Sequence, residues 1–341
     1  MSNIRCLILC LTLCIPAYGF ADNNERATPA PETETVLCGV VPGEFPNAVR
    51  VGLTSKAVEQ DVCYVVMSPQ IGTPVPPEGF PLLILLHGLH GGPGDWLRFP
   101  KILSRIKEAQ EREIHPLPPM IVVVPLGKNG YWTNWNRSNR RWRDWVTHEL
   151  LKDIETRFPH ASQIPEKRAI AGYSMGGFGA LSIALQYPGL FGLAIGLSPT
   201  DMDLAIQGKS QHRVYKRVFG KDLPLERIHR FNPYHQVKNG AGENQSFFIA
   251  FGSNEAAKFK EGGIRLTALM KERNIEVSSH EIAGGTHSFK STWSRPIMES
   301  WLRWLSVYWA EKPGDGMKRP PLMKAKPLIP ESKTPLENQK K

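Results

Sequence analysis

The stretch 168–187 limits what this chain can fold into more than any other part of the sequence. Ala169–Ala171 form a short apolar run typical of the end of a buried strand, and Gly172–Gly176 match the pattern G-x-S-x-G. Phe178–Tyr187 then carry helical spacing. A strand, a tight turn and a helix in this order hold the central serine in a strained conformation at the carboxyl edge of a sheet. The stretch therefore predicts that Ser174 is a nucleophile.

Apolar runs and helical patterns alternate along most of the chain. Strands are expected at 82–86, 120–124, 190–197, 246–251 and 275–282, and helices at 97–113, 145–158, 256–273 and 296–310. This alternation predicts an α/β fold with a mostly parallel sheet and helices on both faces. Two earlier runs, 48–53 and 62–67, alternate in the manner of antiparallel edge strands. Residues 200–245 are polar and predicted to be irregular, and we interpret them as a cap or insertion over the carboxyl edge of the sheet.

A serine hydroxyl needs a base to take its proton. Of the ten histidines, His287 is the best candidate, because it lies in a glycine-flanked loop directly after the last predicted strand. The base in turn needs a carboxylate to orient it. Glu255 follows the strand 246–251 and is the preferred acid; Asp201 is its rival, and Asp203 is a weaker one.

An oxyanion hole needs two backbone N–H donors aimed at the developing negative charge. Met175, directly after the serine, is expected to provide one, and Leu89, in the loop after strand 82–86, the other. His87 and His90 in that loop resemble metal ligands, but no third ligand at a suitable spacing accompanies them. We therefore predict neither a metal site nor a cofactor.

The two ends of the chain have their own compositions. Residues 1–21 contain Arg5, an apolar run and a small-residue site, the layout of a cleavable signal peptide that predicts a secreted or periplasmic protein. Residues 22–35 are expected to be a flexible linker to a single domain at 36–311. Residues 312–341, rich in proline and lysine, are expected to be disordered.

Export changes how the cysteines are interpreted. Three of the five lie in the leader, which leaves Cys38 and Cys63 in the mature chain. Two cysteines in an oxidising compartment suggest one disulfide, and two buried free thiols are the alternative.

The net charge of +10 does not indicate a nucleic-acid partner. Residues 312–341 contain eight Lys/Arg and three Asp/Glu and so supply half of it, and the rest is spread along the chain. The basic tail could instead contact an anionic cell envelope. The sequence contains no information on oligomeric state.

Four motifs in order resemble the esterase D group, whose members include S-formylglutathione hydrolases, enterochelin-type and feruloyl esterases, and mycobacterial mycolyl transferases. They are His87–Trp96, Tyr131–Trp135, Gly172–Gly179 and the ending with Gly285, His287 and Trp293. The resemblance covers about residues 36–310. It implies an α/β-hydrolase fold, with Ser174 as nucleophile, His287 as base, Glu255 as acid, and Leu89 and Met175 as oxyanion donors. This group more often has aspartate as the acid, and 200–245 match no subfamily pattern.

Together with the predicted signal peptide, the resemblance implies an exported serine carboxylesterase that acts on a small-molecule, glycan or lipid ester through an acyl-enzyme. An acyltransferase that passes the acyl group to a sugar or lipid alcohol is the alternative, and a non-catalytic envelope- or carbohydrate-binding protein is a further one. Trp132 and Trp135 follow a predicted strand and are candidates for substrate binding, because aromatic rings stack on aryl or sugar groups.

Overall fold

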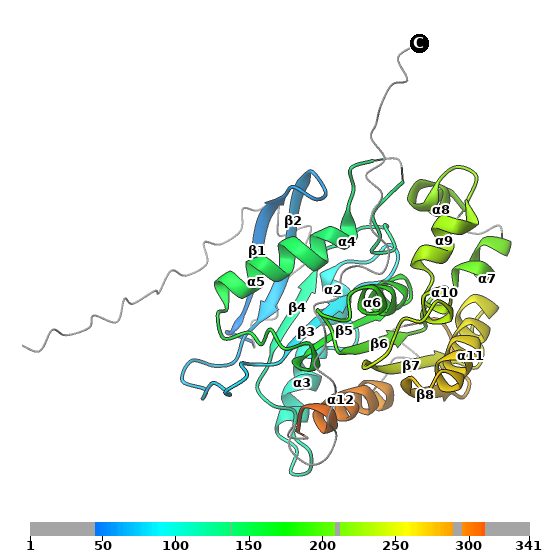
Figure 1. Ribbon diagram of the computed structural model, residues 1–341. Coiled ribbons are helices and arrows are strands. Elements are labelled where there is room, and N and C mark those ends of the chain that lie inside the picture. Colours follow the sequence, from blue (N-terminus) through cyan, green and yellow to red (C-terminus); the bar gives the residue numbers. More distant parts are fainter. Residues whose placement is uncertain (1–44, 137, 209–211, 289–294, 311–341) are drawn as a thin grey trace, which may run out of the picture.

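A single eight-stranded sheet organises the described part of the chain (Figure 1). The computed structural model describes residues 45–136, 138–208, 212–288 and 295–310. Its strands are β1 (Ala48–Ser55), β2 (Gln60–Met67), β3 (Leu82–Leu86), β4 (Ile121–Pro125), β5 (Arg168–Tyr173), β6 (Leu193–Leu197), β7 (Ser246–Gly252) and β8 (Glu276–Ile282). The spatial order is β1-β2-β4-β3-β5-β6-β7-β8.

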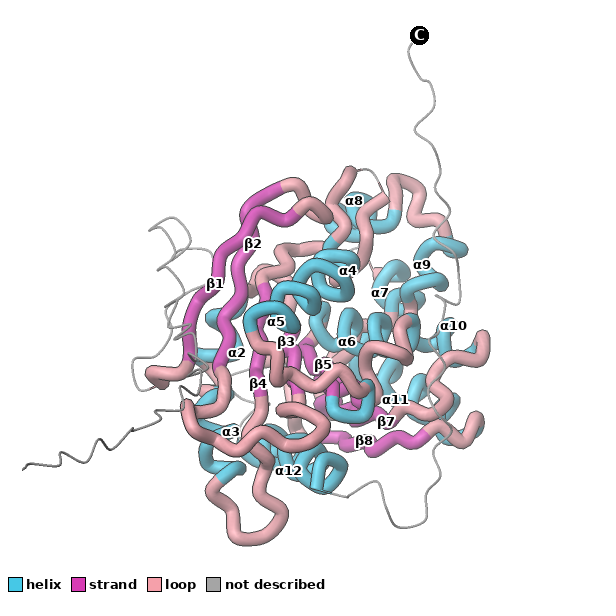
Figure 2. The backbone as a smooth tube through the Cα atoms, turned by 60° about the vertical axis from the view of Figure 1, so that its left-hand side comes forward, coloured by secondary structure: helices cyan, strands magenta, loops and turns pink. Residues whose placement is uncertain are grey.

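Strand direction divides the sheet into two parts. β1 pairs antiparallel with β2, and β2 pairs antiparallel with β4, whereas every pair from β4 to β8 is parallel. Figure 2 shows the β1–β2 hairpin at one edge of the sheet. The predicted α/β-hydrolase fold, with a mostly parallel sheet and antiparallel N-terminal strands, is confirmed.

Helices cover both faces of the sheet, as predicted. The helical segments before the nucleophile are α2 (Pro93–Arg98), α3 (Ile102–Gln110), α4 (Trp142–Asp144), a π-helical turn (Trp145–Leu150), α5 (Leu151–Arg157) and a 3₁₀ turn (Pro165–Lys167). Those after it are α6 (Met175–Gln186), α7 (Met202–Gln207), α8 (His212–Phe219), α9 (Leu225–Phe231), α10 (Pro233–Lys238), α11 (Ala257–Glu272) and α12 (Arg295–Ala310). The predicted helix at 97–113 is thus two shorter helices, α2 and α3.

The two faces of the sheet form separate apolar cores. Within β3, Leu82 and Ile84 pack with residues of α5, α6 and α11, while Leu83 and Leu85 pack with residues of α3 and α12. This alternation follows from the two-residue repeat of a strand. Because both faces are covered, β3 is apolar throughout and fully buried.

The segment 200–245 differs from its prediction as an irregular stretch. It contains the four helices α7 to α10, and its apolar side chains Tyr215, Phe219, Ile228 and Phe231 are buried in the core beside α6. Short helical runs separated by Gly220, Pro224 and Pro233 hid this periodicity, since each run spans only about two turns. The segment is an insertion between β6 and β7 that contributes to the core.

Several predictions fall wholly or partly outside the described residues. These are the signal peptide at 1–21, the linker at 22–35 and the basic tail at 312–341. Cys63 is buried in β2, but Cys38 lies outside the described residues, so the predicted disulfide stays a prediction. No helix in the described ranges is both long and apolar enough to cross a bilayer.

Candidate active site

Ser174 lies in the sharp turn between β5 and α6. Its φ of 58° and ψ of −115° are strained for a residue with a side chain, and its N–H donates to Leu197 O at 2.8 Å. The flanking glycines make the turn possible. A Cβ at residue 172 would lie 2.1 Å from Gly176 O, and one at residue 176 would lie 2.1 Å from Leu86 O.

Three predicted side chains form one hydrogen-bonded row. The Oγ of Ser174 lies 2.9 Å from Nε2 of His287, and Nδ1 of His287 lies 2.9 Å from Oε1 of Glu255. The three residues follow β5, β8 and β7, which end at the same edge of the sheet. A hydroxyl, an imidazole and a carboxylate in this order can deprotonate the hydroxyl and stabilise the charged ring.

The carboxylate of Glu255 is fixed by further partners. Ser198 donates from Oγ to Oε1 at 2.6 Å, and the N–H of Gly252 donates to Oε2 at 3.0 Å. The side chain of Glu255 has no exposed surface. These donors replace water around a buried charge and hold the carboxylate against His287.

Asp201, the rival acid, has a different environment. Its Oδ1 caps α7 by accepting from the N–H of Asp203, and its Oδ2 lies 2.6 Å from Nε of Arg265. Burial raises the pKa of Asp201, and the charge of Arg265 opposes this shift. Of Glu255 and Asp201, Glu255 is the carboxylate that the structure places beside His287.

The ring of His287 is stacked between two aromatic side chains. Phe259 lies 3.8 Å away between ring centres at an angle of 13°, and Tyr173 lies 4.9 Å away at 25°. Lys258 Nζ lies 5.0 Å from the centre of the Phe259 ring, and burial lowers the pKa of this lysine. The two rings restrict the imidazole to the plane in which it reaches both Ser174 and Glu255.

The loop after β3 lies directly beside the serine. A Cβ at residue 88 would lie 3.6 Å from Cβ of Ser174, so the backbone approaches the nucleophile closely. Leu89, half-buried, is the next residue of this loop, and Met175 is the first residue of α6. Both predicted N–H donors therefore belong to backbone segments that adjoin Ser174.

His87 holds this loop in place. Its Nε2 accepts from the N–H of Gly127 at 3.0 Å, so the proton is on Nδ1, which donates to Gly88 O at 2.8 Å. Complete burial lowers the pKa of His87 to about 4, and the ring is neutral at pH 7. Both ring nitrogens of His87 therefore have protein partners, and this side chain joins the loop after β3 to the backbone at Gly127.

Trp132 is in the core, and Trp135 is only partly exposed. The indole of Trp132 is fully buried, and its Nε1 donates to His87 O at 3.2 Å. A Cβ at Gly179 would lie 2.6 Å from this side chain, which explains the glycine there. Trp135 is half-buried beneath the guanidinium of Arg217 in α8, 5.8 Å from its ring. Trp132 thus supports the β3 loop rather than lining an open pocket.

Sequence reasoning missed the roles of three residues of this site: Tyr173, Ser198 and Phe259. Each acts by packing or by a hydrogen bond across the sheet edge, and such contacts have no fixed spacing along the chain. Ser198 had one recognisable signal, because a polar residue directly after the apolar run 190–197 is expected at the carboxyl end of a strand.

Comparisons with known proteins point to one family. Residues 55–303 match the family model described as "Putative esterase". A curated acetyl esterase of Caldicellulosiruptor saccharolyticus is 31% identical over 154 residues, which cover 42% of this chain and 53% of the relative. The esterase Rv1288 of Mycobacterium tuberculosis is 34% identical over 119 residues, 34% of this chain and 24% of the relative. The matched part thus spans between a quarter and about half of these relatives.

Solved structures share the fold at lower identity. The Staphylococcus aureus fluorophosphonate-binding serine hydrolase FphF superposes with a TM-score of 0.64 and 17% identity, covering 76% of this chain and 98% of that one. An S-formylglutathione hydrolase from Agrobacterium tumefaciens gives 0.61 and 19%, covering 76% and 95%. The predicted resemblance to the esterase D group is confirmed at the level of family and fold. With the family match extending over most of the domain, this chain belongs to the esterase family of α/β-hydrolases.

Proposed function

We propose that this protein is a serine carboxylesterase that works through an acyl-enzyme, with Ser174, His287 and Glu255 as its triad. The observation that supports this most directly is the continuous row of hydrogen bonds from the Ser174 hydroxyl to the Glu255 carboxylate. The esterase family of the chain agrees with this activity.

In the first half of the reaction, Ser174 Oγ attacks the carbonyl carbon of an ester while Nε2 of His287 takes its proton. Glu255 accepts a hydrogen bond from Nδ1 and stabilises the imidazolium that forms. The N–H groups of Leu89 and Met175 donate to the oxyanion. His287 then gives its proton to the leaving alcohol.

In the second half, His287 deprotonates a water molecule that attacks the acyl-serine. The bond between the acyl carbon and Ser174 Oγ then breaks, and His287 returns the proton to Oγ as the acid is released. If an alcohol took the place of water, the same groups would carry out acyl transfer. Product analysis in the presence of sugar and lipid alcohols separates these outcomes, because hydrolysis yields the free acid, whereas acyl transfer yields a new ester of the added alcohol.

The test is Ser174→Ala with p-nitrophenyl acetate and butyrate as substrates. We expect kcat/KM to fall by more than about a thousandfold, because the nucleophile is removed while the oxyanion donors remain. Ser300→Ala is the matched control and should keep normal activity. It removes a hydroxyl that donates a hydrogen bond to Pro296 O inside α12. A fluorophosphonate probe should label the wild type and the control but not Ser174→Ala. Activity of Ser174→Ala within tenfold of wild type would contradict the proposal.

A further inference from the structure

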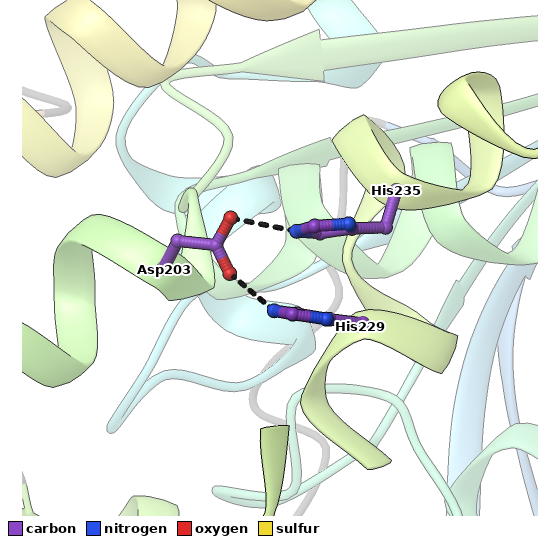
Figure 3. A group of neighbouring side chains, drawn as sticks. All are labelled: Asp203, His229 and His235. Atoms are coloured by element: carbon purple, nitrogen blue, oxygen red, sulfur yellow. Dashed lines mark hydrogen bonds and ion pairs between the residues drawn. The ribbon is translucent and has the colours of Figure 1, made fainter. Parts of the chain in front are cut away.

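A second group of chemically active side chains lies in the insertion between β6 and β7. Asp203 of α7, His229 of α9 and His235 of α10 point toward one another (Figure 3). Nε2 of His235 lies 2.8 Å from Oδ2 of Asp203, and Nε2 of His229 lies 3.3 Å from Oδ1. One ligand atom of each residue lies within 4.8 Å of the others. None of the three belongs to the triad.

Two details make this cluster unlike an ordinary ion pair. Oδ1 of Asp203 is buried, yet it accepts no hydrogen bond from the described residues, and His229 Nε2 meets it only as an ion-pair contact at 3.3 Å. The imidazoles of His229 and His235 are stacked 3.6 Å apart between ring centres at an angle of 16°. Two protonated rings in this stack would repel each other, which disfavours a double ion pair with one carboxylate.

We propose that Asp203, His229 and His235 bind one divalent transition-metal ion, for which Zn²⁺ is the best match. Two neutral imidazoles and a carboxylate are the donor set that Zn²⁺ prefers, with bonds of about 2.0–2.2 Å. Donor atoms around such a tetrahedral ion are about 3.3 Å apart, and the two imidazole rings must rotate out of their stack so that both Nε2 lone pairs point at the ion. The three side chains are partly exposed, which leaves room for a water molecule as the fourth ligand.

Arg265 of α11 does not prevent this binding. Its Nη2 contacts Oδ2 of Asp203 and its Nε contacts Oδ2 of Asp201, both at 2.6 Å, while its guanidinium lies over the Tyr234 ring. Oδ1 of Asp203 is therefore left for the ion. Asp201, Asp203 and Arg265 together carry a net charge of −1 when the histidines are neutral. The local electrostatic potential therefore favours binding of a divalent cation.

An ion at this site would link three short helices that already pack into the apolar core. α7, α9 and α10 have six, seven and six residues, and helices of this length are not stable alone. Metal bound only in the folded state stabilises that state by an amount that grows with the logarithm of the ratio of free metal to Kd. Metal binding at this site would thus stabilise the insertion between β6 and β7. This inference does not depend on the proposed esterase activity.

The test uses the full-length protein without a histidine tag, first stripped with chelator and then titrated with Zn²⁺ by calorimetry. We expect one site with a Kd at or below about 10 μM, weakened at least tenfold in His229→Ala and in His235→Ala. His160→Ala, which removes an exposed histidine outside the cluster, is the control and should bind normally. His287→Ala should also bind normally, which excludes zinc bound at the triad.

Two further readouts separate a metal site from a structural ion pair. Co²⁺ in place of Zn²⁺ should give visible absorption bands of tetrahedral intensity that are absent from His235→Ala. Zn²⁺ should raise the Tm of the wild type and of His160→Ala but not of His229→Ala. Absence of saturable binding up to 100 μM, or binding that is equal in all the variants, would overturn the proposal even if esterase activity were established.

Discussion

At the scale of single residues, the geometry of His287 depends on its neighbours as much as on its own position. The imidazole has hydrogen-bond partners at both nitrogens, and it has aromatic rings against its flat faces. The hydrogen bonds direct Nε2 to Ser174 and Nδ1 to Glu255. The rings of Phe259 and Tyr173 limit rotation of the imidazole out of the plane that contains these two bonds. Phe259 is therefore a positioning residue for the base.

Replacement of Phe259 by Ala should lower kcat on p-nitrophenyl acetate by about tenfold while KM changes less than threefold. The stacked ring holds His287 in position for proton transfer, which affects the chemical step more than substrate binding. Phe259→Tyr should restore kcat, since it keeps the stacked ring. Phe158→Ala, a half-buried aromatic at the end of α5, is the control. A rise in KM with unchanged kcat would show that Phe259 contacts substrate instead.

At the scale of elements, the β5–α6 turn depends on close backbone approach. The crossing of this turn with the end of β3 brings Gly176 so near to Leu86 O that a methyl group has no space. The atom in the way is backbone, and the neighbouring strand cannot move without breaking its ladder with β5. The site thus depends on the registers of β3 and β5.

Gly176→Ala should lower the free energy of unfolding by about 3 kcal/mol, or the Tm by about 5–10 °C, because of this overlap. Gly208→Ala is the matched control. A Cβ there would lie 3.7 Å from Ala205 O, an ordinary contact, and its φ of −80° suits alanine. Equal Tm values for the two variants, measured by thermal unfolding, would contradict this account of the turn.

Some of the helices, strands and site residues could be predicted from the sequence alone, and others could not. Strands β3 to β7 were predictable because each contains a continuous apolar run, and Ser174 was predictable because its motif requires a strand before it and a helix after it. The loop position of His287 followed from chain order. The helices of 200–245 were not predictable, since each is too short to show a periodicity, and their packing depends on α6. The stacking of Phe259 and the meeting of Asp203 with His229 depend on contacts between separate helices, which spacing cannot reveal.

At the scale of the whole molecule, one buried histidine links stability to pH. His87 is neutral in the folded state, with its pKa lowered to about 4 by burial, whereas an exposed histidine in the unfolded chain titrates near 6.5. Between these values the unfolded chain binds more protons, so folding stability falls as pH falls. Above about pH 6.5 this effect is absent.

Between pH 7 and 4.5 the free energy of unfolding should therefore fall by about 2 kcal/mol through this residue. His87→Gln, whose Oε1 can accept from the N–H of Gly127, should reduce the pH dependence by a similar amount, as measured by urea unfolding at the two pH values. His160→Gln removes an exposed histidine and should leave the slope unchanged. An equal slope in the His87 variant would show that the ring is not buried neutral.

The strand order of the sheet has one more consequence. Ser174, Ser198, Glu255 and His287 follow β5, β6, β7 and β8, four consecutive neighbours in one ladder. The distances among these four residues are set by the spacing of adjacent parallel strands, about 4.8 Å. They are not set by the chain segments that connect one strand to the next. The connections between these strands, including the long one that contains α7 to α10, therefore do not set these distances. A change in that connection reaches the reacting atoms only through its packing against the sheet and α6.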